Sequence, residues 1–300
     1  MGAHPASCGE PEWLPVRQPR SLVVYRDGRF ERVDDVVASE YALTIFVGDQ
    51  EMATVVCTPD HLEDLVVGFL ASEGVIRRPD QLVDLTVVRA RGIARVKTTT
   101  QVTFNQAFYN KRYIGSCCGK GRQMFYYYND AQLVRRIDDP VRIRPDDVLA
   151  RMAELEAGAH LWRETGGVHM ASLCTPEGTV LARTDIGRHN ALDKLYGHVL
   201  RNGLDVSGHL IAFSGRLSSE VLLKVAKIGV GMVIAKSAPT ALALDIAQET
   251  GVTAIGFARR GGFHVYTHPW RVQGAADSSE GHEAPGHLAP GNLDVGQPLD

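Results

Sequence analysis

Apolar strands alternate with helices over the part of this chain that follows Gly166. A predicted hairpin comes first, and three further strands follow, each preceded by a helix: Val168–Cys174 with Thr179–Ala182, then Leu210–Phe213, Met232–Ala235 and Thr253–Phe257. Strands that alternate with helices form a sheet that helices cover on both faces. We therefore expect an α/β fold, in which ligands bind beyond the carboxyl ends of the strands.

Three junctions between a strand and a helix carry polar residues suited to an anion. In the segment Asp185–Lys194, Arg188 and His189 fall in the first helical turn, where free backbone N–H groups and the positive helix end favour an anion. Similar junctions follow at Ser214-Gly215-Arg216 and at Ser237-Ala238-Pro239-Thr240. Ordinary helix capping explains each of the last two junctions taken alone. Together the three junctions indicate a phosphorylated, nucleotide-like ligand.

The last predicted strand runs into Phe257-Ala258-Arg259-Arg260-Gly261-Gly262. Aromatic rings and Arg side chains stack on planar bases and pterins, so this segment is a candidate site for the flat end of a nucleotide. The alternative is a hairpin turn between Ile255 and Tyr266 with solvated arginines. His169, at the start of an apolar strand, is expected to be hydrogen-bonded structure.

Two adjacent cysteines, Cys117 and Cys118, lie in a predicted Gly-rich loop of residues 114–122. Basic neighbours lower the pKa of a thiol, and thiolates attack sulfur readily; the neighbours here are Lys111, Arg112, Lys120 and Arg122. Adjacent Cα atoms are about 3.8 Å apart, below the ~4.4–6.8 Å of most disulfides, so a dithiol switch is disfavoured. The remaining interpretations are a nucleophile or sulfur carrier and a pair of buried structural cysteines.

The other cysteines and the overall composition limit the class of protein. Cys57 and Cys174 lie in apolar strands and are expected in the core, and the absence of any Cys-x-x-Cys motif makes zinc unexpected. The net charge of -3 implies no general attraction to nucleic acid. Neither a signal peptide nor an apolar run of about 20 residues is evident. We therefore expect a cytoplasmic protein without a membrane or nucleic-acid partner.

Sequence patterns divide the chain into four parts. A flexible N-terminus is expected over residues 1–20, an α+β part with the cysteine loop over 21–138, the α/β part with the binding junctions over 139–272, and a disordered tail over 273–300. The α+β part contains two predicted hairpins, Tyr41–Val47 with Met52–Cys57 and Leu82–Arg89 with Ile93–Thr99. Between them Thr58 is the expected N-cap of a helix that ends at Gly74, and Pro145 begins another helix in the α/β part.

Five motifs occur in an order that resembles one known family, the formate dehydrogenase accessory sulfurtransferases (FdhD/NarQ). They are Thr165-Gly166-Gly167-Val168-His169, the segment Asp185–Lys194, Ser214-Gly215-Arg216, Ser237-Ala238-Pro239-Thr240 and Gly256-Phe257-Ala258-Arg259. The resemblance covers about residues 40 to 272. It implies a cytidine-deaminase-like sheet covered by helices, without the deaminase zinc, in a protein that is usually a homodimer.

The same resemblance implies a sulfur relay. A cysteine desulfurase would load a persulfide onto a loop cysteine. That sulfur would pass to the molybdenum of the bis-molybdopterin guanine dinucleotide cofactor, which activates formate dehydrogenase. The family's cofactor-binding stretch falls on Phe257 to Gly262, and the junctions at Arg188, Ser214, Arg216, Ser237 and Thr240 fit the phosphates of such a ligand.

The cysteine motif departs from the family pattern. The family commonly has Cys-Gly-x-Cys-Gly, whereas this chain has Cys117-Cys118-Gly119-Lys120-Gly121. We expect Cys118 to carry the persulfide, because Gly119 follows it as a glycine follows the family cysteines, and Cys117 is a second candidate. Two other functions remain open: a cofactor chaperone without sulfur chemistry, and a nucleotide-processing hydrolase, which would need bound zinc.

Overall fold

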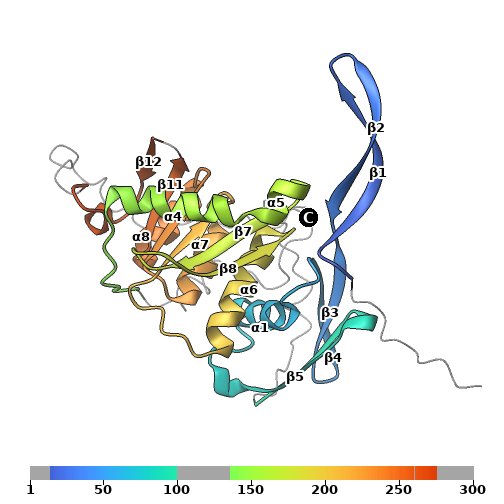
Figure 1. Cartoon of the computed structure of the whole chain (residues 1–300). Helices are drawn as coiled ribbons and strands as arrows, with labels where there is room; N and C mark the ends of the chain where they lie inside the picture. Colours follow the sequence, from blue (N-terminus) through green and yellow to red (C-terminus); the bar gives the residue numbers. More distant parts are fainter. Residues whose placement is uncertain (1–13, 100–135, 260, 276–300) are drawn as a thin grey trace, which may run out of the picture.

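A computed structural model describes residues 14–99, 136–259 and 261–275 of the chain, and places most of them in three β-sheets and the helices around them (Figure 1). The largest sheet has six strands in the order β12-β11-β10-β9-β7-β8. Its strands are β7 (His169–Cys174), β8 (Thr179–Asp185), β9 (Leu210–Phe213), β10 (Met232–Ala235), β11 (Thr253–Arg259) and β12 (Gly262–Val265). Strands β9, β10 and β11 are mutually parallel, while β7, β8 and β12 pair antiparallel with their neighbours.

Helices cover both faces of this sheet, as the sequence predicts. One face carries α6 (Arg188–Arg201), α7 (Ser219–Ile228) and α8 (Ala241–Thr250), and the other carries α4 (Pro145–Gly158). Strand β9 shows the division residue by residue. Ile211 and Phe213 belong to the buried cluster on the first face, whereas Leu210 and Ala212 belong to the cluster under α4. This alternation is the period of two that a strand imposes.

The predicted α/β class is therefore observed, as a mixed sheet, and its cytidine-deaminase-like character stays a prediction. Pro145 begins α4, as predicted, and a short helix α5 (His160–Thr165) follows it. A 3-10 turn over Pro269–Arg271 follows the last strand. None of the described helices combines the length and apolar composition that a membrane span requires.

Both hairpins predicted before residue 100 are present. Strands β3 (Tyr41–Val47) and β4 (Gln50–Cys57) pair antiparallel, and so do β5 (Leu82–Val88) and β6 (Ile93–Thr98). A parallel pairing of β3 with β6 joins them into one sheet of order β4-β3-β6-β5. Short 3-10 turns over Pro79–Gln81 and Arg89–Arg91 flank β5.

The helix between these hairpins begins later than predicted. Helix α1 spans Leu62–Ser72 and its N-cap is His61, so Thr58 does not cap it. The Thr58 hydroxyl instead donates to Asp60 at 2.8 Å or to Asp185 at 3.0 Å. Asp185 is fully buried, and a buried carboxylate requires donors. The prediction was wrong because a carboxylate 127 positions away outweighs the local capping preference.

Helices α1 and α6 cross at two glycines that no sequence pattern singles out. A Cβ at Gly68 would overlap the backbone carbonyl of Asp193, and a Cβ at Gly197 would overlap that of Asp64. Buried ion pairs flank the crossing: Asp64 binds Arg183 at 2.7 Å and Arg201 at 2.5 Å. Burial alone would raise the pKa of Asp64, but these two arginines outweigh burial and hold it below its usual value. One hydrophobic cluster runs from Leu43 through α1 and α6 to Ile211.

A third, two-stranded sheet consists of β1 (Arg17–Arg26) and β2 (Arg29–Ala38). Its first four residues fall in the stretch expected to be flexible. They are ordered in β1 because they pair in register with Asp35–Ala38. We refer to this β1–β2 hairpin as the arm.

Replacing Gly68 with Ala tests the close crossing of α1 and α6. We expect Gly68→Ala to lower the free energy of unfolding by about 3 kcal/mol or more, because backbone cannot move aside as a side chain can. Urea denaturation measures this change through a lower midpoint at an unchanged slope.

The matched control for that experiment is Gly158→Ala near the end of α4. An added Cβ there makes an ordinary 3.6 Å contact with Met170, so stability should stay the same or rise slightly. Equal stability of the two variants would contradict the close crossing.

Candidate functional site

The second and third predicted junctions and the Phe257 segment lie side by side in the structure. Strands β9, β10 and β11 are parallel, so their carboxyl ends meet at one edge of the sheet. Hydrogen bonds join the loops that follow them: Thr240 N–H donates to Leu217 O at 2.9 Å, and Phe257 N–H donates to Ser237 O at 3.3 Å. Backbone contacts therefore hold the loops at 214–218 and 236–240 and the start of the Phe257 segment together. We call this edge the strand-end site.

The segment Asp185–Lys194 contains residues that hold the fold together as well as Arg188 and His189 at the strand-end site. Asp185 accepts hydrogen bonds from Gly187 N–H at 2.8 Å and from Asn190 Nδ2 at 2.9 Å, and Lys194 Nζ lies 2.8 Å from its other oxygen. Asp185 and Lys194 are both fully buried. These residues fasten the start of α6 to the end of β8, and Arg188 and His189 take no part in these contacts.

The guanidinium of Arg188 lacks a counterion among the described residues. Its Nε and Nη2 atoms are closed to solvent and have no hydrogen-bond acceptor in that part of the chain. The side chain packs at the second junction, because a Cβ on Gly215 would lie 3.4 Å from Arg188 Cδ. An unpaired guanidinium with buried N–H groups is costly. The arrangement therefore suits an anion that would complete its hydrogen bonds.

Two histidines lie close to Arg188. His189 Nε2 is 3.0 Å from Glu220 Oε2 in the first turn of α7, at ion-pair distance but without the alignment of a hydrogen bond. Burial lowers the pKa of His189, and Glu220 offsets only part of that effect. Burial, followed by the charge of Arg188, lowers the pKa of His169 as well. Both histidines are therefore neutral near pH 7, and Arg188 supplies the charge.

His169 is hydrogen-bonded, as predicted, and it also belongs to the strand-end site, which its place in the sequence did not predict. Its Nδ1 lies 3.3 Å from Ser214 Oγ, which also accepts a hydrogen bond from Met170 N–H at 2.9 Å. Strand β7 runs antiparallel to β9, so the first residue of β7 lies where β9 ends. Recognising this from sequence would have required knowing that β7 and β9 are neighbours.

The hydroxyl groups at the helix starts are not used as caps. Ser218 and Thr240 occupy the N-cap positions of α7 and α8, yet neither side chain makes a capping hydrogen bond. The Ser218 residue is 5% exposed, and its Oγ has no partner in the described residues. Arg216 is exposed at the rim, and Gly215 is buried against the ring of Phe213. The first-turn N–H groups of these two helices thus have no side-chain cap, and such N–H groups suit a phosphate.

The Phe257 segment turns sharply at the end of β11. Phe257 has a φ of +52°, rare for a bulky residue, and the pairing of β11 with β12 shifts register between Gly256 and Arg259. This bend leaves the Phe257 ring 38% exposed and 5.0 Å from the ring of His264. The predicted hairpin turn is thus present and also displays an aromatic ring at the site, a form of strain often found at binding sites.

Comparison with known proteins places these residues in a family. The model of the FdhD/NarQ family matches residues 38–273. The chain belongs to the FdhD/NarQ family. It is 51% identical over 254 residues to the Sulfur carrier protein FdhD of Bacillus subtilis, covering 85% of this chain and 97% of that protein. A protein of the same name from Geobacillus kaustophilus is 49% identical over 253 residues, covering 84% and 96%.

A solved structure shares the fold. The crystal structure of a protein described as a formate dehydrogenase accessory protein, from Desulfotalea psychrophila, superimposes with a TM-score of 0.72 at 22% identity. The alignment covers 86% of this chain and all of that one. The family model and the curated relatives confirm the family named from five sequence motifs, and the solved structure has the same overall fold.

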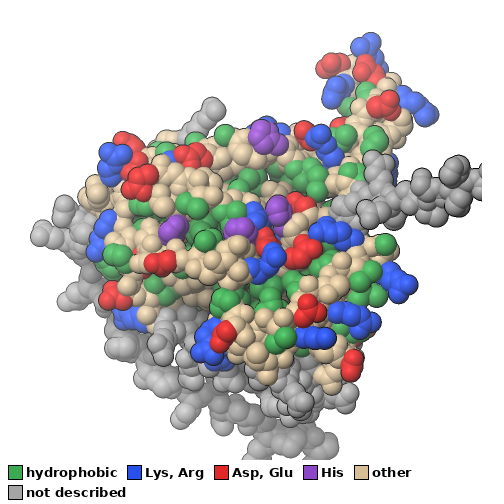
Figure 2. All heavy atoms as spheres, turned by 60° about the horizontal axis from the view of Figure 1, so that its bottom comes forward, with side chains coloured by type: hydrophobic (Ala, Val, Ile, Leu, Met, Phe, Trp, Pro, Cys, Tyr) green, Lys and Arg blue, Asp and Glu red, His purple; other side chains and the backbone are tan. Residues whose placement is uncertain are grey.

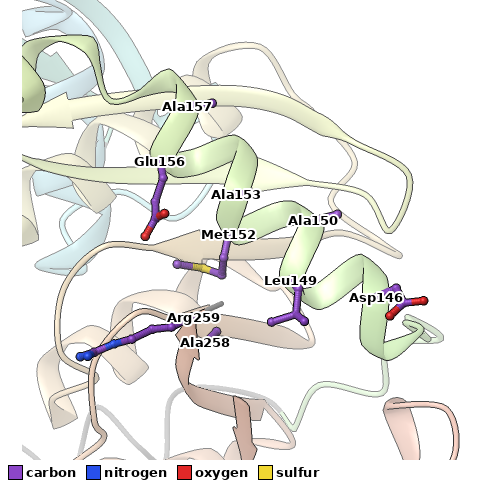
Figure 3. A pocket seen from close by; sticks show the side chains of 9 residues that line it. All are labelled: Asp146, Leu149, Ala150, Met152, Ala153, Glu156, Ala157, Ala258 and Arg259. Atoms are coloured by element: carbon purple, nitrogen blue, oxygen red, sulfur yellow. The ribbon is translucent and has the colours of Figure 1, made fainter. Parts of the chain in front are cut away.

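A pocket of about 590 Å³ lies beside the Phe257 segment of this FdhD/NarQ chain (Figure 3). Apolar side chains of α4 line it, among them Leu149 and Met152, together with Ala258 and Arg259 from the end of β11. Glu156, also in its wall, forms a 2.8 Å ion pair with Lys236, whose backbone oxygen accepts a hydrogen bond from Arg259 Nε. Of the remaining predicted residues, Gly261 is exposed in the turn and Gly262 is exposed at the start of β12, while Arg260 lies outside the described residues.

The cysteines fall into two groups. Cys57 and Cys174 are fully buried, as predicted, and burial raises the pKa of the Cys57 thiol to about 12. Cys117 and Cys118 lie outside the described residues, as do Arg112, Lys120 and Arg122. Within residues 14–99, 136–259 and 261–275, no three His, Cys, Asp or Glu side chains gather as metal ligands would. The absence of zinc from the whole chain stays a prediction.

Replacing Arg188 with Met tests whether its guanidinium contributes to anion binding rather than to the stability of the fold. We expect Arg188→Met to leave the free energy of unfolding unchanged or about 1 kcal/mol higher, because it removes an unpaired charge with buried N–H groups. Stabilisation of the protein by added pyrophosphate should disappear. Thermal unfolding with and without pyrophosphate measures both effects.

Arg216→Met is the control, since its side chain is exposed. It should change stability by less than about 0.5 kcal/mol and weaken pyrophosphate binding only in part. A wild-type protein that pyrophosphate does not stabilise would contradict an anion role for this site.

Proposed function

We propose that this protein is a sulfurtransferase that carries persulfide sulfur from a cysteine desulfurase to bis-molybdopterin guanine dinucleotide, for formate dehydrogenase. Membership of the FdhD/NarQ family and the sulfur carrier proteins among its relatives support the sulfur step. The partners would be a cysteine desulfurase, formate dehydrogenase and a second copy of the chain, all in the cytoplasm. The molybdenum cofactor is the acceptor substrate in this scheme.

The observation that carries the cofactor half of the proposal is the guanidinium of Arg188, unpaired among the described residues. It lies next to the Ser214-Gly215-Arg216 junction, which hydrogen bonds connect to the Ser237–Thr240 junction. A guanine dinucleotide carries phosphates that suit such a group of donors. Two helix starts with unused cap hydroxyls, at Ser218 and Thr240, add donors on the same edge.

The flat part of the same ligand would lie against Phe257. Its ring is exposed beside the strand ends, and the neighbouring pocket under α4 offers an apolar wall with Glu156 in it. Arg259 is exposed between the two and can stack on a purine or pterin. In this arrangement the phosphates and the ring system of one ligand occupy adjoining parts of the strand-end site.

The sulfur step would use the cysteine pair. The Cys118 thiolate attacks the terminal sulfur of the desulfurase persulfide, the sulfur–sulfur bond of that persulfide breaks, and the desulfurase cysteine leaves as its thiolate. The product is a persulfide on Cys118, and no outside oxidant or reductant is required for this exchange. Lys120, Arg112 and Arg122 flank the pair in sequence and would favour the thiolate.

Intact-protein mass spectrometry tests the sulfur step. We expect the wild-type protein, after incubation with a cysteine desulfurase and cysteine, to gain the mass of one sulfur atom that a reductant removes. Cys118→Ala should abolish the gain and Cys117→Ala should retain it. Cys57→Ala is the control, because that thiol is buried and should contribute no sulfur.

Other results of the experiment with the desulfurase would favour a different carrier cysteine or a different function. Loss of the added sulfur only in Cys117→Ala would move the carrier to Cys117 and keep the function. No sulfur on the wild-type protein, with the desulfurase shown to be active, would favour a cofactor chaperone. Formate dehydrogenase activity that survives replacement of both cysteines would favour the same chaperone.

Guanosine diphosphate tests the base-binding half. Aromatic stacking on a base contributes about 1–3 kcal/mol, so Phe257→Ala should weaken binding of guanosine diphosphate roughly fivefold to hundredfold. Titration calorimetry measures the dissociation constant. Trp270→Ala is the matched control, since this exposed aromatic follows His268, which contacts the opposite end of β11 at Thr253. Equal losses in both variants would contradict the assignment.

A further inference from the structure

The phosphate-suited groups of the strand-end site do not distinguish one base from another. As in complexes with DNA, contacts to phosphate position a ligand and carry no information about its base. The overall charge does not distinguish bases either. It is only -3, and Figure 2 shows acidic and basic side chains interspersed over the face that it views, on the body and on the arm alike. A preference for one ring system therefore requires side chains that contact the ring itself.

One face of α4 forms a flat wall of the pocket beside the end of β11. Ala150, Ala153 and Ala157 line the pocket and follow one another at intervals of three and four residues, which places them on one side of the helix. Their methyl groups give this side little relief. Leu149 and Met152 continue the wall with longer apolar side chains (Figure 3). A flat, apolar wall of this kind suits the face of a planar ring.

The carboxylate of Glu156 interrupts this apolar wall. Glu156 lies four residues after Met152 and lines the same pocket, and Figure 3 shows its side chain directed from α4 toward the end of β11. Its Oε1 atom lies 2.8 Å from the ammonium group of Lys236, and Oε2 has no hydrogen-bond donor among the described residues. A carboxylate has about four positions at which it can accept a hydrogen bond, so most of its capacity is unused.

Lys236 determines where this carboxylate lies. Its ammonium group contacts Glu156 and lies 5.8 Å from the centre of the Trp162 ring in α5, and its backbone oxygen accepts a hydrogen bond from Arg259 Nε at 3.3 Å. Lys236 also directly precedes Ser237, so one loop connects the phosphate-suited groups with the pocket. Because the charge of Lys236 offsets that of Glu156, an anionic nucleotide can approach the carboxylate.

A carboxylate with unused acceptor capacity selects planar rings by the groups along their edges. Guanine presents two neighbouring donors, N1–H and the 2-amino group, and a carboxylate can accept from both at once. Adenine presents the lone pair of N1 beside its 6-amino group, and that lone pair would face the carboxylate. Hypoxanthine keeps N1–H but lacks the 2-amino group. A pterin has the same 2-amino-4-oxo edge as guanine, with N3–H beside its amino group.

We propose that Glu156 determines which ring system the pocket accepts, by taking two hydrogen bonds from a 2-amino-4-oxopyrimidine edge. The ring lies against α4, and Arg259 stacks on its face. Stacking accepts every flat ring, so the selection comes from the carboxylate, which Lys236 positions. The inference rests on the cofactor half of the proposed function, whose ligand contains this edge in its guanine and in its pterin, and adds the residue that recognises it.

Titration calorimetry with three nucleoside diphosphates tests the role of Glu156. The wild type should bind guanosine diphosphate roughly threefold or more tighter than inosine diphosphate, and roughly tenfold or more tighter than adenosine diphosphate. Glu156→Gln should lower both ratios by about threefold or more, because glutamine offers one donor and one acceptor, the pattern that matches adenine. Each ratio compares ligands with the same phosphates, so a general effect of the lost charge on phosphate binding cancels.

Asp146→Asn is the matched control. It makes the same chemical change in a carboxylate at the opposite end of α4, in the same pocket (Figure 3), and both ratios should keep their wild-type values. Pyrophosphate, which has no base, should bind Glu156→Gln at least as tightly as the wild type. That result shows that the variant is folded and that its phosphate-suited groups are intact.

Pterin and lumazine extend the test to the other ring system, because lumazine has an oxygen where pterin has its 2-amino group. Selection of guanosine over inosine diphosphate that Glu156→Gln reduces assigns the pocket to guanine, and a preference for pterin over lumazine that the same variant reduces assigns it to the pterin. Unchanged ratios in Glu156→Gln, or an equal change in Asp146→Asn, would overturn the inference while bound guanosine diphosphate still supported the proposed function. A wild type that binds none of these ligands would overturn both.

Discussion

Asp185 lies fully buried at the end of β8, and four residues meet at its carboxylate. One oxygen accepts hydrogen bonds from Gly187 N–H and Asn190 at the start of α6, and the other meets Thr58 before α1 and Lys194 from within α6. A buried charge with all its partners in place permits little displacement. The direction in which α6 leaves the sheet, and with it the position of Arg188, depends on this carboxylate.

Arg188 presents the opposite case, three residues further along. It is held by the same turn but its Nε and Nη2 have no acceptor in the described residues. The segment Asp185–Lys194 thus contains a buried carboxylate, Asp185, whose hydrogen bonds fix the start of α6. It also contains a guanidinium, that of Arg188, whose buried N–H groups have no acceptor in the described residues. The unpaired guanidinium lowers the stability of the free protein. Its charge is already in position for an anionic ligand, so no side chain would have to move on binding.

The sequence was a sound guide wherever structure depends on neighbours along the chain. Alternating apolar residues located both hairpins and the central strands, and the polar strand ends identified junctions that the sheet brings together. It failed where a distant partner decides. Thr58 bonds to Asp185 rather than capping α1, and nothing in the sequence places His169 at the strand-end site, where it reaches Ser214 because β7 pairs with β9. The requirement for glycine at positions 68 and 197 likewise follows only from the close crossing of α1 and α6.

The crossing of α1 and α6 also has a consequence for how the chain reaches its fold. Helix α1 buries Leu65 and Leu70 in a cluster that includes Leu192 and Leu195 of α6, more than 120 residues later in the chain. During synthesis, much of the apolar face of α1 therefore stays uncovered until α6 has been made. Contacts between such distant segments slow folding, and the exposed interval is one in which aggregation competes. The amino-terminal sheet and helix are thus expected to depend on the carboxyl-terminal half for their folding.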